Sequence, residues 1–254
     1  MSSDPFPHSD TVEVDGAALP AAAVWSALAQ HLTPARRQRI REVAAGRSFA
    51  VATVMEHVHD DGNIAAVLRT CEGIGFPVVQ VIRAAADPGA PARPPNRVTQ
   101  GADKWLEVAW WNAGDPWLER LRGDGYRVLV TRVGDGPTID QVDFSRPTAV
   151  VFGNEHAGVT DATAQAADGW FSIPMAGFTR SFNISVAVAM VLQHARRSRA
   201  AAHGGDGELT ADQRLILAAR YAVRSLPSAG ALLRRALGDD SFDIGCASHE
   251  GSDA

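Results

Sequence analysis

Three separate segments of the chain carry polar side chains that could act together in one reaction. The first starts at Asn63 and carries Arg69, the second carries Glu155 in a turn bracketed by glycines, and the third ends with Ser181 and Asn183. A guanidinium can hold a phosphate group through two hydrogen bonds, and a carboxylate can orient such a cation or a substrate group. Side chains of these types could form one polar site if the fold brings the three segments together.

Each segment also has a plainer interpretation when it is taken alone. Arg69 could be an ordinary exposed residue of a helix. The turn around Glu155 is typical of many connections between a strand and a helix. Ser181 or Asn183 could serve only as a helix N-cap. From the residues alone, these alternatives stay open.

Motifs of several other chemistries are missing from the sequence. No Gly-x-Gly-x-x-Gly follows an expected strand, and neither a P-loop nor a Gly-x-Ser-x-Gly elbow occurs, which disfavours dinucleotide enzymes, P-loop proteins and the common α/β hydrolases. Cys71 and Cys246 are the only cysteines, and they provide neither a disulfide framework nor a thiolate metal site. His57 and His59 could be imagined as metal ligands, but without a matching third cluster a polar turn is the preferred interpretation. No membrane span or secretory signal is recognisable, so we expect a cytoplasmic protein.

Strands and helices alternate through the central part of the chain. Short apolar runs rich in β-branched and aromatic residues predict strands at 49–55, 78–82, 106–111, 126–131, 149–152 and 170–173. Helical patterns lie between several of these runs, at about 63–74, 116–123, 160–167 and 182–199. Such alternation predicts an α/β fold with a mainly parallel sheet flanked by helices. In the first of these helices, Asn63 or Asp61 is the expected N-cap.

The two ends of the chain differ from this central domain, which we place at 48–200. Residues 1–19 are polar, acidic and without periodicity, and we predict that they are disordered. Residues 20–47 are expected to form a helical, Arg-rich extension, in which Thr33 caps a helix that begins with proline. Residues 201–254 are expected to form a C-terminal helical extension followed by an acidic tail.

The net charge of −5 argues mildly against a nucleic-acid partner, since phosphate contacts supply most non-specific affinity for RNA. The distribution of charge matters more than the sum, and the arginines are clustered. The Arg-rich N-terminal helix is either a solvated face or an arm that contacts RNA. Its candidate RNA-binding residues are Arg36, Arg37, Arg39 and Arg41. Further basic residues are Arg47, Arg180, Arg196, Arg197, Arg199, Arg234 and Arg235.

Taken together, the three polar segments resemble motifs 1, 2 and 3 of the SpoU/TrmH branch of the SPOUT superfamily. The matching stretches are 63–71, 153–158 and 173–183, and the similarity extends from about residue 36 to residue 199. Members of this branch transfer a methyl group from S-adenosylmethionine (AdoMet) to a ribose 2′-hydroxyl of RNA. The resemblance implies an enzyme that uses AdoMet and no metal.

The resemblance also implies roles for individual side chains. Arg69 would stand beside the target ribose. Because a guanidinium is a poor proton acceptor at neutral pH, we expect it to hold a phosphate and stabilise the developing alkoxide. Asn63, Glu155, Ser181 and Asn183 would complete the catalytic set. The implied AdoMet-binding residues are Thr131, Gly153, Ile173, Met175 and Phe182, although most relatives have leucine at the position of Phe182.

The family's fold contains a deep trefoil knot in the C-terminal half of the domain, and its members work as homodimers, for which helix 182–199 is a candidate interface. The breadth of the similarity points to enzymes that methylate guanosine 18 in the D-loop of tRNA. Two alternatives stay open: the same reaction on ribosomal RNA, and a catalytically silent protein that binds RNA or AdoMet.

Overall fold

The computed structural model describes residues 5–84, 101–205, 207–238 and 242. The chain divides into two compact units. The sheet unit comprises residues 1–5 and 48–206, and the terminal unit comprises residues 6–47 and 207–254. The proline-rich segment 84–96, whose composition predicts a surface loop, lies almost wholly outside the described residues.

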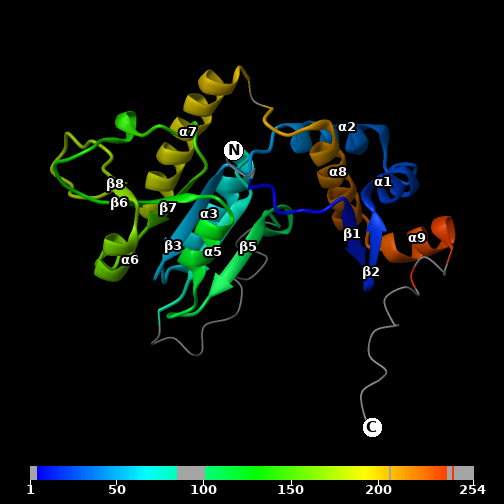
Figure 1. Ribbon diagram of the computed structural model, residues 1–254, viewed down its shortest axis with the longest axis horizontal. Helices are drawn as coiled ribbons and strands as arrows, with labels where there is room; N and C mark the ends of the chain where they lie inside the picture. The colour runs from blue at the N-terminus through cyan, green and yellow to red at the C-terminus, as the bar shows by residue number, and fades with distance from the viewer. Residues whose placement is uncertain (1–4, 85–100, 206, 239–241, 243–254) are drawn as a thin grey trace, which may run out of the picture. The chain divides into compact units, whose positions relative to one another are not determined.

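The sheet unit is built on six parallel strands (Figure 1). Their order in the sheet is β5-β4-β3-β7-β6-β8, and each neighbouring pair runs parallel. The strands are β3 (Val51–Glu56), β4 (Val78–Ile82), β5 (Glu107–Trp111), β6 (Arg127–Thr131), β7 (Thr148–Phe152) and β8 (Gly169–Phe171). Every residue of β3, β4 and β7 is buried, as expected for inner strands that have both faces covered. The predicted α/β fold with a parallel sheet is therefore confirmed.

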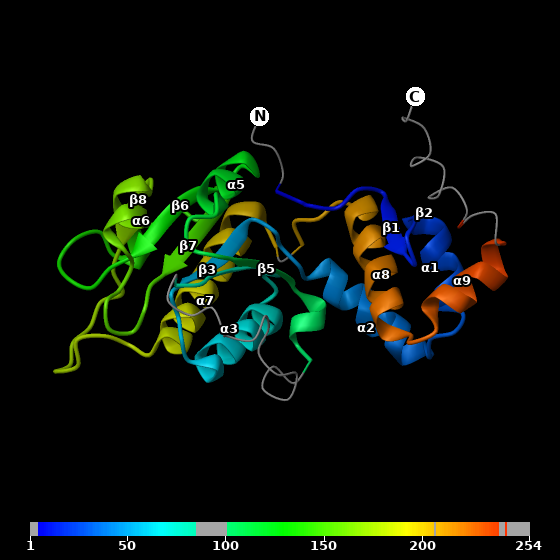
Figure 2. The same ribbon diagram turned by 90° about the horizontal axis from the view of Figure 1, so that it is seen from below.

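Helices cover both faces of this sheet. The helices are α3 (Asp61–Ile74), α5 (Trp117–Gly123), α6 (Asp161–Ala166) and α7 (Ile184–His203), and short 3₁₀ turns lie at Asp103–Trp105 and Ile139–Gln141. Figure 2 shows α3 and α7 side by side on one face and α5 on the other. The predicted strands and helices all form, with small shifts at their ends. The trefoil knot implied by the resemblance stays a prediction.

The N-cap of α3 differs from the expected one. The side chain of Asp60 accepts a hydrogen bond from the backbone N–H of Asn63 at 2.7 Å, so Asp60 is the cap and neither Asp61 nor Asn63 fills this role. A carboxylate one residue before the first helical turn is well placed to accept this bond. The side chain of Asn63 is consequently available for other partners.

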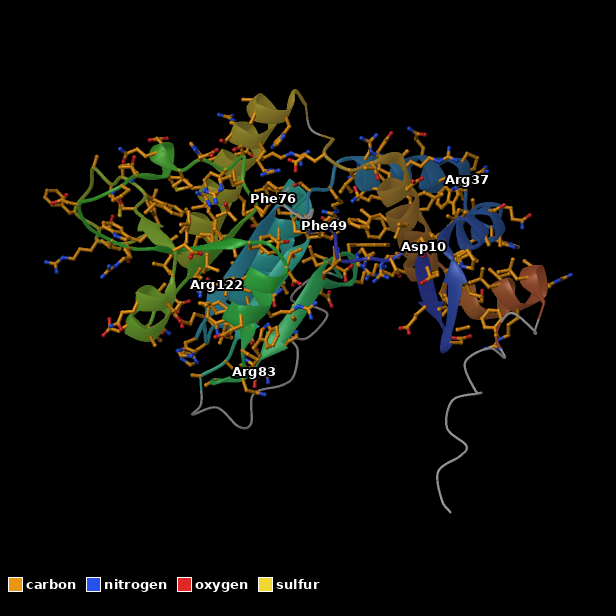
Figure 3. The ribbon with its side chains drawn as sticks, in the orientation of Figure 1. Asp10, Arg37, Phe49, Phe76, Arg83 and Arg122 are labelled. Atoms are coloured by element: carbon orange, nitrogen blue, oxygen red, sulfur yellow. The ribbon has the colours of Figure 1, made fainter. Side chains whose placement is uncertain are left out.

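Because all six strands run the same way, their carboxyl ends meet at one edge of the sheet. Figure 3 marks Phe49 and Phe76, which precede β3 and β4, at one end of these strands, and Arg83, which follows β4, at the other. Ligands of open α/β sheets bind outside the carboxyl ends of the strands. This edge is therefore where the segments after β3, β7 and β8 can form a site.

The terminal unit contains a β-hairpin that the sequence analysis missed. Residues 1–19 were expected to be disordered and a helical extension was expected from residue 20, but β1 (Thr11–Val14) and β2 (Ala17–Pro20) pair antiparallel. Asp15 and Gly16 both take positive φ angles, as a tight two-residue hairpin turn requires. Alternate residues on each strand are buried, so an Asp-Gly pair between two alternating segments was the signal that pointed to this hairpin.

Four helices complete the terminal unit: α1 (Ala21–Ala29), α2 (Pro34–Ala45), α8 (Ala211–Ser225) and α9 (Ala229–Leu237). Helix α8 packs against both α1 and α2. The expected cap at Thr33 is confirmed, and Thr210 and Gln213 form a capping box at the start of α8. No helix in the described part of the chain has the length and apolar character that crossing a membrane requires.

Candidate active site

Hydrogen bonds connect three polar side chains that are far apart in the sequence. Asn183, at the start of α7, donates from Nδ2 to Oδ1 of Asn63 at 3.0 Å. Asn63, in the first turn of α3, donates from Nδ2 to Oε1 of Glu155 at 2.8 Å. Glu155 lies in the loop that follows β7 and is exposed. One side chain from each of the three polar segments therefore belongs to a single connected group.

The direction of this hydrogen-bonded chain follows from the N-cap of α7. Oδ1 of Asn183 accepts from the backbone N–H of Ser185 at 2.9 Å and from its hydroxyl at 2.6 Å. A backbone N–H can only donate, so Nδ2 of Asn183 must face Asn63. Asn63 then presents its oxygen to Asn183 and its NH₂ group to Glu155, whose carboxylate accepts. The second carboxylate oxygen of Glu155 can accept a hydrogen bond from a substrate. The sequence analysis did not identify Ser185.

The loop that carries Glu155 is held in a tight conformation by its own backbone. Asn154 and Gly158 exchange two backbone hydrogen bonds of 3.1 and 2.9 Å, and Oδ1 of Asn154 accepts from the N–H groups of His156 and Ala157. Gly153, at the start of the loop, packs directly against the backbone of Gly158 and Val159 at the end of the loop. A Cβ atom at Gly153 would lie 2.0 Å from the carbonyl carbon of Gly158. Only glycine fits at position 153 in this conformation.

The residues expected to bind AdoMet follow three adjacent strands at the same sheet edge. Thr131 ends β6, Gly153 follows β7 and Ile173 follows β8, and these strands are neighbours in the order β7-β6-β8. The hydroxyl of Thr131 donates to the backbone oxygen of Val151 at 3.0 Å, which fixes its rotamer. Ile173 is half-buried against the core cluster. Half-buried apolar groups at the ends of strands suit the adenine ring of a nucleoside.

The other predicted site residues near this edge are more exposed. Met175 is half-buried, and Phe182 is 38% exposed. Ser181 is exposed, directly before Phe182 and Asn183. Arg69 is also exposed and lies six residues after Asn63 on α3, which is about 9 Å along the helix axis and about 120° around it. Arg69 thus projects in a different direction from the side chain of Asn63.

The four arginines predicted to bind RNA lie on α2 in the terminal unit, where Figure 3 marks Arg37. Arg39 and Arg41 are exposed; Arg39 pairs with Glu42 at 3.8 Å, and Arg41 lies over the ring of Trp25 at 5.3 Å. Arg36 is half-buried and donates to the hydroxyl of Ser225 at 3.2 Å. Arg36 therefore has a structural contact with α8, and Arg37, Arg39 and Arg41 are the better candidates for contact with RNA.

Two further arginines of the basic clusters are buried and do not contribute to a positive surface. Arg47 is 1% exposed and donates from Nε to the hydroxyl of Tyr221 at 3.2 Å. Arg199 is 5% exposed and donates from Nη1 to the backbone oxygens of Phe144 and Ser145. Arg47 and Arg199 are close in the sequence to exposed arginines, but they pack inside the protein and are not part of a basic face.

Within the described residues, no group of three or more His, Cys, Asp or Glu side chains is arranged to hold a metal ion. His57, which the sequence suggested only as a remote metal ligand, is in the left-handed region at φ 56°. Its backbone oxygen accepts a hydrogen bond from Nδ2 of Asn154 at 2.9 Å. His57 thus supports the Glu155 loop through its backbone.

Comparison with known proteins gives a consistent result. The model of the SpoU rRNA Methylase family matches residues 50–193. A tRNA (guanosine(18)-2′-O)-methyltransferase of Thermus thermophilus is 36% identical over 168 residues, which cover 66% of this chain and 84% of that protein.

Solved structures agree with this match. The A. aeolicus TrmH/SpoU tRNA modifying enzyme is 27% identical with a TM-score of 0.64, covering 76% of this chain and 97% of that one. The SpoU methyltransferase AviRb from Streptomyces viridochromogenes, in complex with the cofactor AdoMet, is 26% identical with a TM-score of 0.52 and covers 59% of this chain and 60% of that one.

Proposed function

We propose, from the premise that this chain belongs to the SpoU methylase family, that it methylates the ribose 2′-hydroxyl of guanosine 18 in tRNA. Family membership makes it an AdoMet-dependent RNA 2′-O-methyltransferase, so the predicted family, enzyme class and methyl donor are confirmed. The observation that carries the proposal is the hydrogen-bonded chain Asn183–Asn63–Glu155, which joins the three family motifs at the carboxyl edge of the sheet.

The choice of tRNA over ribosomal RNA rests on the relatives. The Thermus thermophilus relative is named for guanosine 18 of tRNA, and the match covers most of its length. The A. aeolicus enzyme is described as tRNA modifying, and almost all of it is covered by this chain. These relatives favour a tRNA substrate for this chain.

The residues at the strand ends fit AdoMet. Ile173, Met175 and Phe182 would enclose the adenine, and the tight turn at Gly153 would present backbone groups to the nucleoside, beside Thr131. When bound, AdoMet supplies a sulfonium methyl group that a ribose oxygen can attack. The chain's own contribution is to align that oxygen and to exclude water from the site.

In the proposed mechanism, one catalytic group stabilises charge and the others orient the reacting groups. We infer that Arg69 holds a phosphate of the RNA and stabilises the developing alkoxide of the ribose. Glu155, oriented by Asn63, accepts a hydrogen bond from Arg69 or from the nucleotide. Asn183 and Ser181 border the reacting centre. The proton of the 2′-hydroxyl passes to the phosphate or to water.

We also propose that the protein works as a homodimer, because within one chain Arg69 projects away from Asn63. The motif 3 segment and α7 expose large apolar side chains: Phe178, Phe182, Val186 and Met190. Val186 and Met190 are spaced four residues apart on α7 and form one short apolar stripe, and Phe182 lies just before the N-cap Asn183. Apolar stripes of this kind are typical of interfaces between subunits. In the dimer, Arg69 reaches the reaction centre across or near the interface.

Replacement of Val186 by aspartate should prevent dimer formation, since it places a charge within the apolar stripe. Sedimentation equilibrium is expected to give twice the chain mass of 26.9 kDa for the wild type and a single chain for the variant. Methyl transfer should fall together with the dimer fraction. Gln165→Asp, on the exposed side of α6, is the matched control and should stay dimeric. A monomeric wild type that is fully active would refute the dimer.

Changing Arg37, Arg39 and Arg41 together to alanine should weaken tRNA binding. If each makes one phosphate contact, the slope of log affinity against log salt should decrease by about 1 per arginine, and AdoMet affinity should not change. Fluorescence anisotropy over a salt series measures this slope. Arg120→Ala, which removes an exposed arginine of α5, should leave the slope unaltered. An unchanged slope for the triple variant would remove α2 from the RNA surface.

The direct test of the function is incubation with labelled AdoMet and unmodified tRNA, and in parallel with ribosomal RNA. Incorporation into tRNA alone supports the proposal, and incorporation into ribosomal RNA alone supports the alternative substrate. Binding of AdoMet by calorimetry without transfer to any RNA would indicate a silent binding protein.

A further inference from the structure

A buried carboxylate lies next to the site but outside the residues assigned to it. Glu56, the last residue of β3, is 3% exposed. One carboxylate oxygen accepts from the backbone N–H of Thr160 at 2.8 Å. The other accepts from the hydroxyl of Thr160 at 2.9 Å and from the hydroxyl of Thr163. Burial of an ionised carboxylate is costly unless hydrogen bonds satisfy it, and here three donors converge on Glu56.

These contacts hold the far end of the Glu155 loop. Thr160 follows the loop directly and is the N-cap of α6, where its side chain accepts from the N–H of Thr163 at 3.3 Å. The residue after Glu56 holds the start of the same loop: the backbone oxygen of His57 accepts a hydrogen bond from Nδ2 of Asn154. Two consecutive residues at the end of β3 therefore bind both ends of the loop that carries Glu155.

The same two residues lead into the helix that carries Asn63. Only three residues separate His57 from Asp61, the first residue of α3, and Asp60 among them caps that helix. The end of β3 is thus the common support of the two segments whose side chains meet in the 2.8 Å contact between Asn63 and Glu155. A shift of the loop relative to β3 would break this contact.

We infer that Glu56 is a positioning residue for methyl transfer, which acts by holding the Glu155 loop in register with α3. The inference rests on the proposed function, since it requires Glu155 to work in the reaction. Glu56 itself is buried behind the loop and does not touch the substrate.

Glu56→Ala should lower kcat by about 10- to 100-fold, because a misplacement of about 1 Å is enough for such a loss. KM for tRNA should change by less than about threefold, because RNA affinity comes mainly from phosphate contacts elsewhere. Glu56→Gln should restore most of the rate. Its amide oxygen can accept from the N–H of Thr160, while its NH₂ group donates to the two threonine hydroxyls, which can turn to accept.

A control separates positioning from stability. Thr148→Val removes a buried hydroxyl at the amino end of β7, away from the site; the Glu155 loop follows the carboxyl end of the same strand. The Thr148 hydroxyl accepts from Nε of Arg127 and donates to the backbone oxygen of Arg146. This variant should lower the melting temperature and leave kcat within about twofold of the wild type, at a temperature where both variants are folded. Thr163→Val, which removes one donor to Glu56, should lower kcat by an intermediate factor.

The decisive experiment is a double-mutant cycle with Glu155→Ala. If Glu56 acts through the loop, Glu56→Ala should reduce kcat much less in the Glu155→Ala background than in the wild type. Equal factors in both backgrounds, or an unchanged kcat in folded Glu56→Ala enzyme, would overturn the inference. A wild type that methylates no RNA would instead refute the proposed function, so the two failures are distinguishable.

Discussion

Replacement of Arg69 by alanine is expected to reduce methyl transfer by about 10²- to 10³-fold or more, with AdoMet affinity changed by less than about twofold. In the proposed mechanism, the guanidinium of Arg69 compensates the negative charge that develops on the ribose oxygen. It lies on α3, apart from the strand ends that would hold the nucleoside of AdoMet. Catalysis should therefore be lost while the cofactor still binds.

Single-turnover kinetics and titration calorimetry measure these two quantities on the same protein. Arg69→Lys should restore only a small part of the rate, because an ammonium cannot bind a phosphate through a two-pronged contact. Thr70→Ala is the matched control: it changes the next residue of α3, whose hydroxyl donates to the backbone oxygen of Ala66 in the same helix. Full activity in Arg69→Ala would exclude the proposed role of Arg69.

Replacement of Gly153 by alanine should abolish both AdoMet binding and methyl transfer. The added Cβ would lie 2.0 Å from the carbonyl carbon of Gly158 and 2.1 Å from the backbone nitrogen of Val159. Neither backbone atom can move without opening the two hydrogen bonds between Asn154 and Gly158. The loop must change conformation, and the expected weakening of AdoMet binding is at least about 100-fold.

Gly158→Ala distinguishes this steric effect from a general sensitivity of the loop to substitution. Gly158 has a φ of +72°, but a Cβ there would meet no atom within 4 Å. Its cost is therefore confined to backbone strain of roughly 1–2 kcal/mol. AdoMet binding should survive in Gly158→Ala and fail in Gly153→Ala, as measured by calorimetry. If the two variants bind AdoMet equally well, the packing of Gly153 has no functional importance.

Much of the fold was predictable because its signals are local. The strands β3, β4 and β7 are continuous apolar runs, and the helices α6 and α8 begin at recognisable caps, Thr160 and Thr210. The hairpin at 11–20 was also marked locally, by Asp15-Gly16 between alternating residues, but the polar composition of the N-terminus obscured it. Local rules also placed the cap of α3 at Asp61 or Asn63, whereas Asp60 is the cap.

The site was only partly predictable, because its contacts join residues far apart in the sequence. The Asn63–Glu155 bond spans 92 positions and the Asn183–Asn63 bond spans 120. No periodicity specifies such pairs, and the resemblance supplied the residues without their hydrogen bonds. Ser185 and Glu56 were missed for a related reason. A serine in the first turn of a helix and a glutamate at the end of a strand become informative only when their partners are known.

Charge clusters were the least reliable signal. Arg36, Arg47 and Arg199 lie in basic stretches of the sequence, yet each one contacts a distant part of its own unit. A long side chain can pack its stem and satisfy its donors within the protein, so an arginine in a basic stretch does not necessarily face solvent. The RNA surface should therefore be sought first among Arg37, Arg39 and Arg41.

The most direct test of the account is mass-spectrometric mapping of methylated riboses in unmodified tRNA after incubation with this protein and AdoMet. The account predicts a single new 2′-O-methylguanosine at position 18 of the D-loop, which disappears with Arg69→Ala. Methylation at another position, on a base, or only in ribosomal RNA would contradict it.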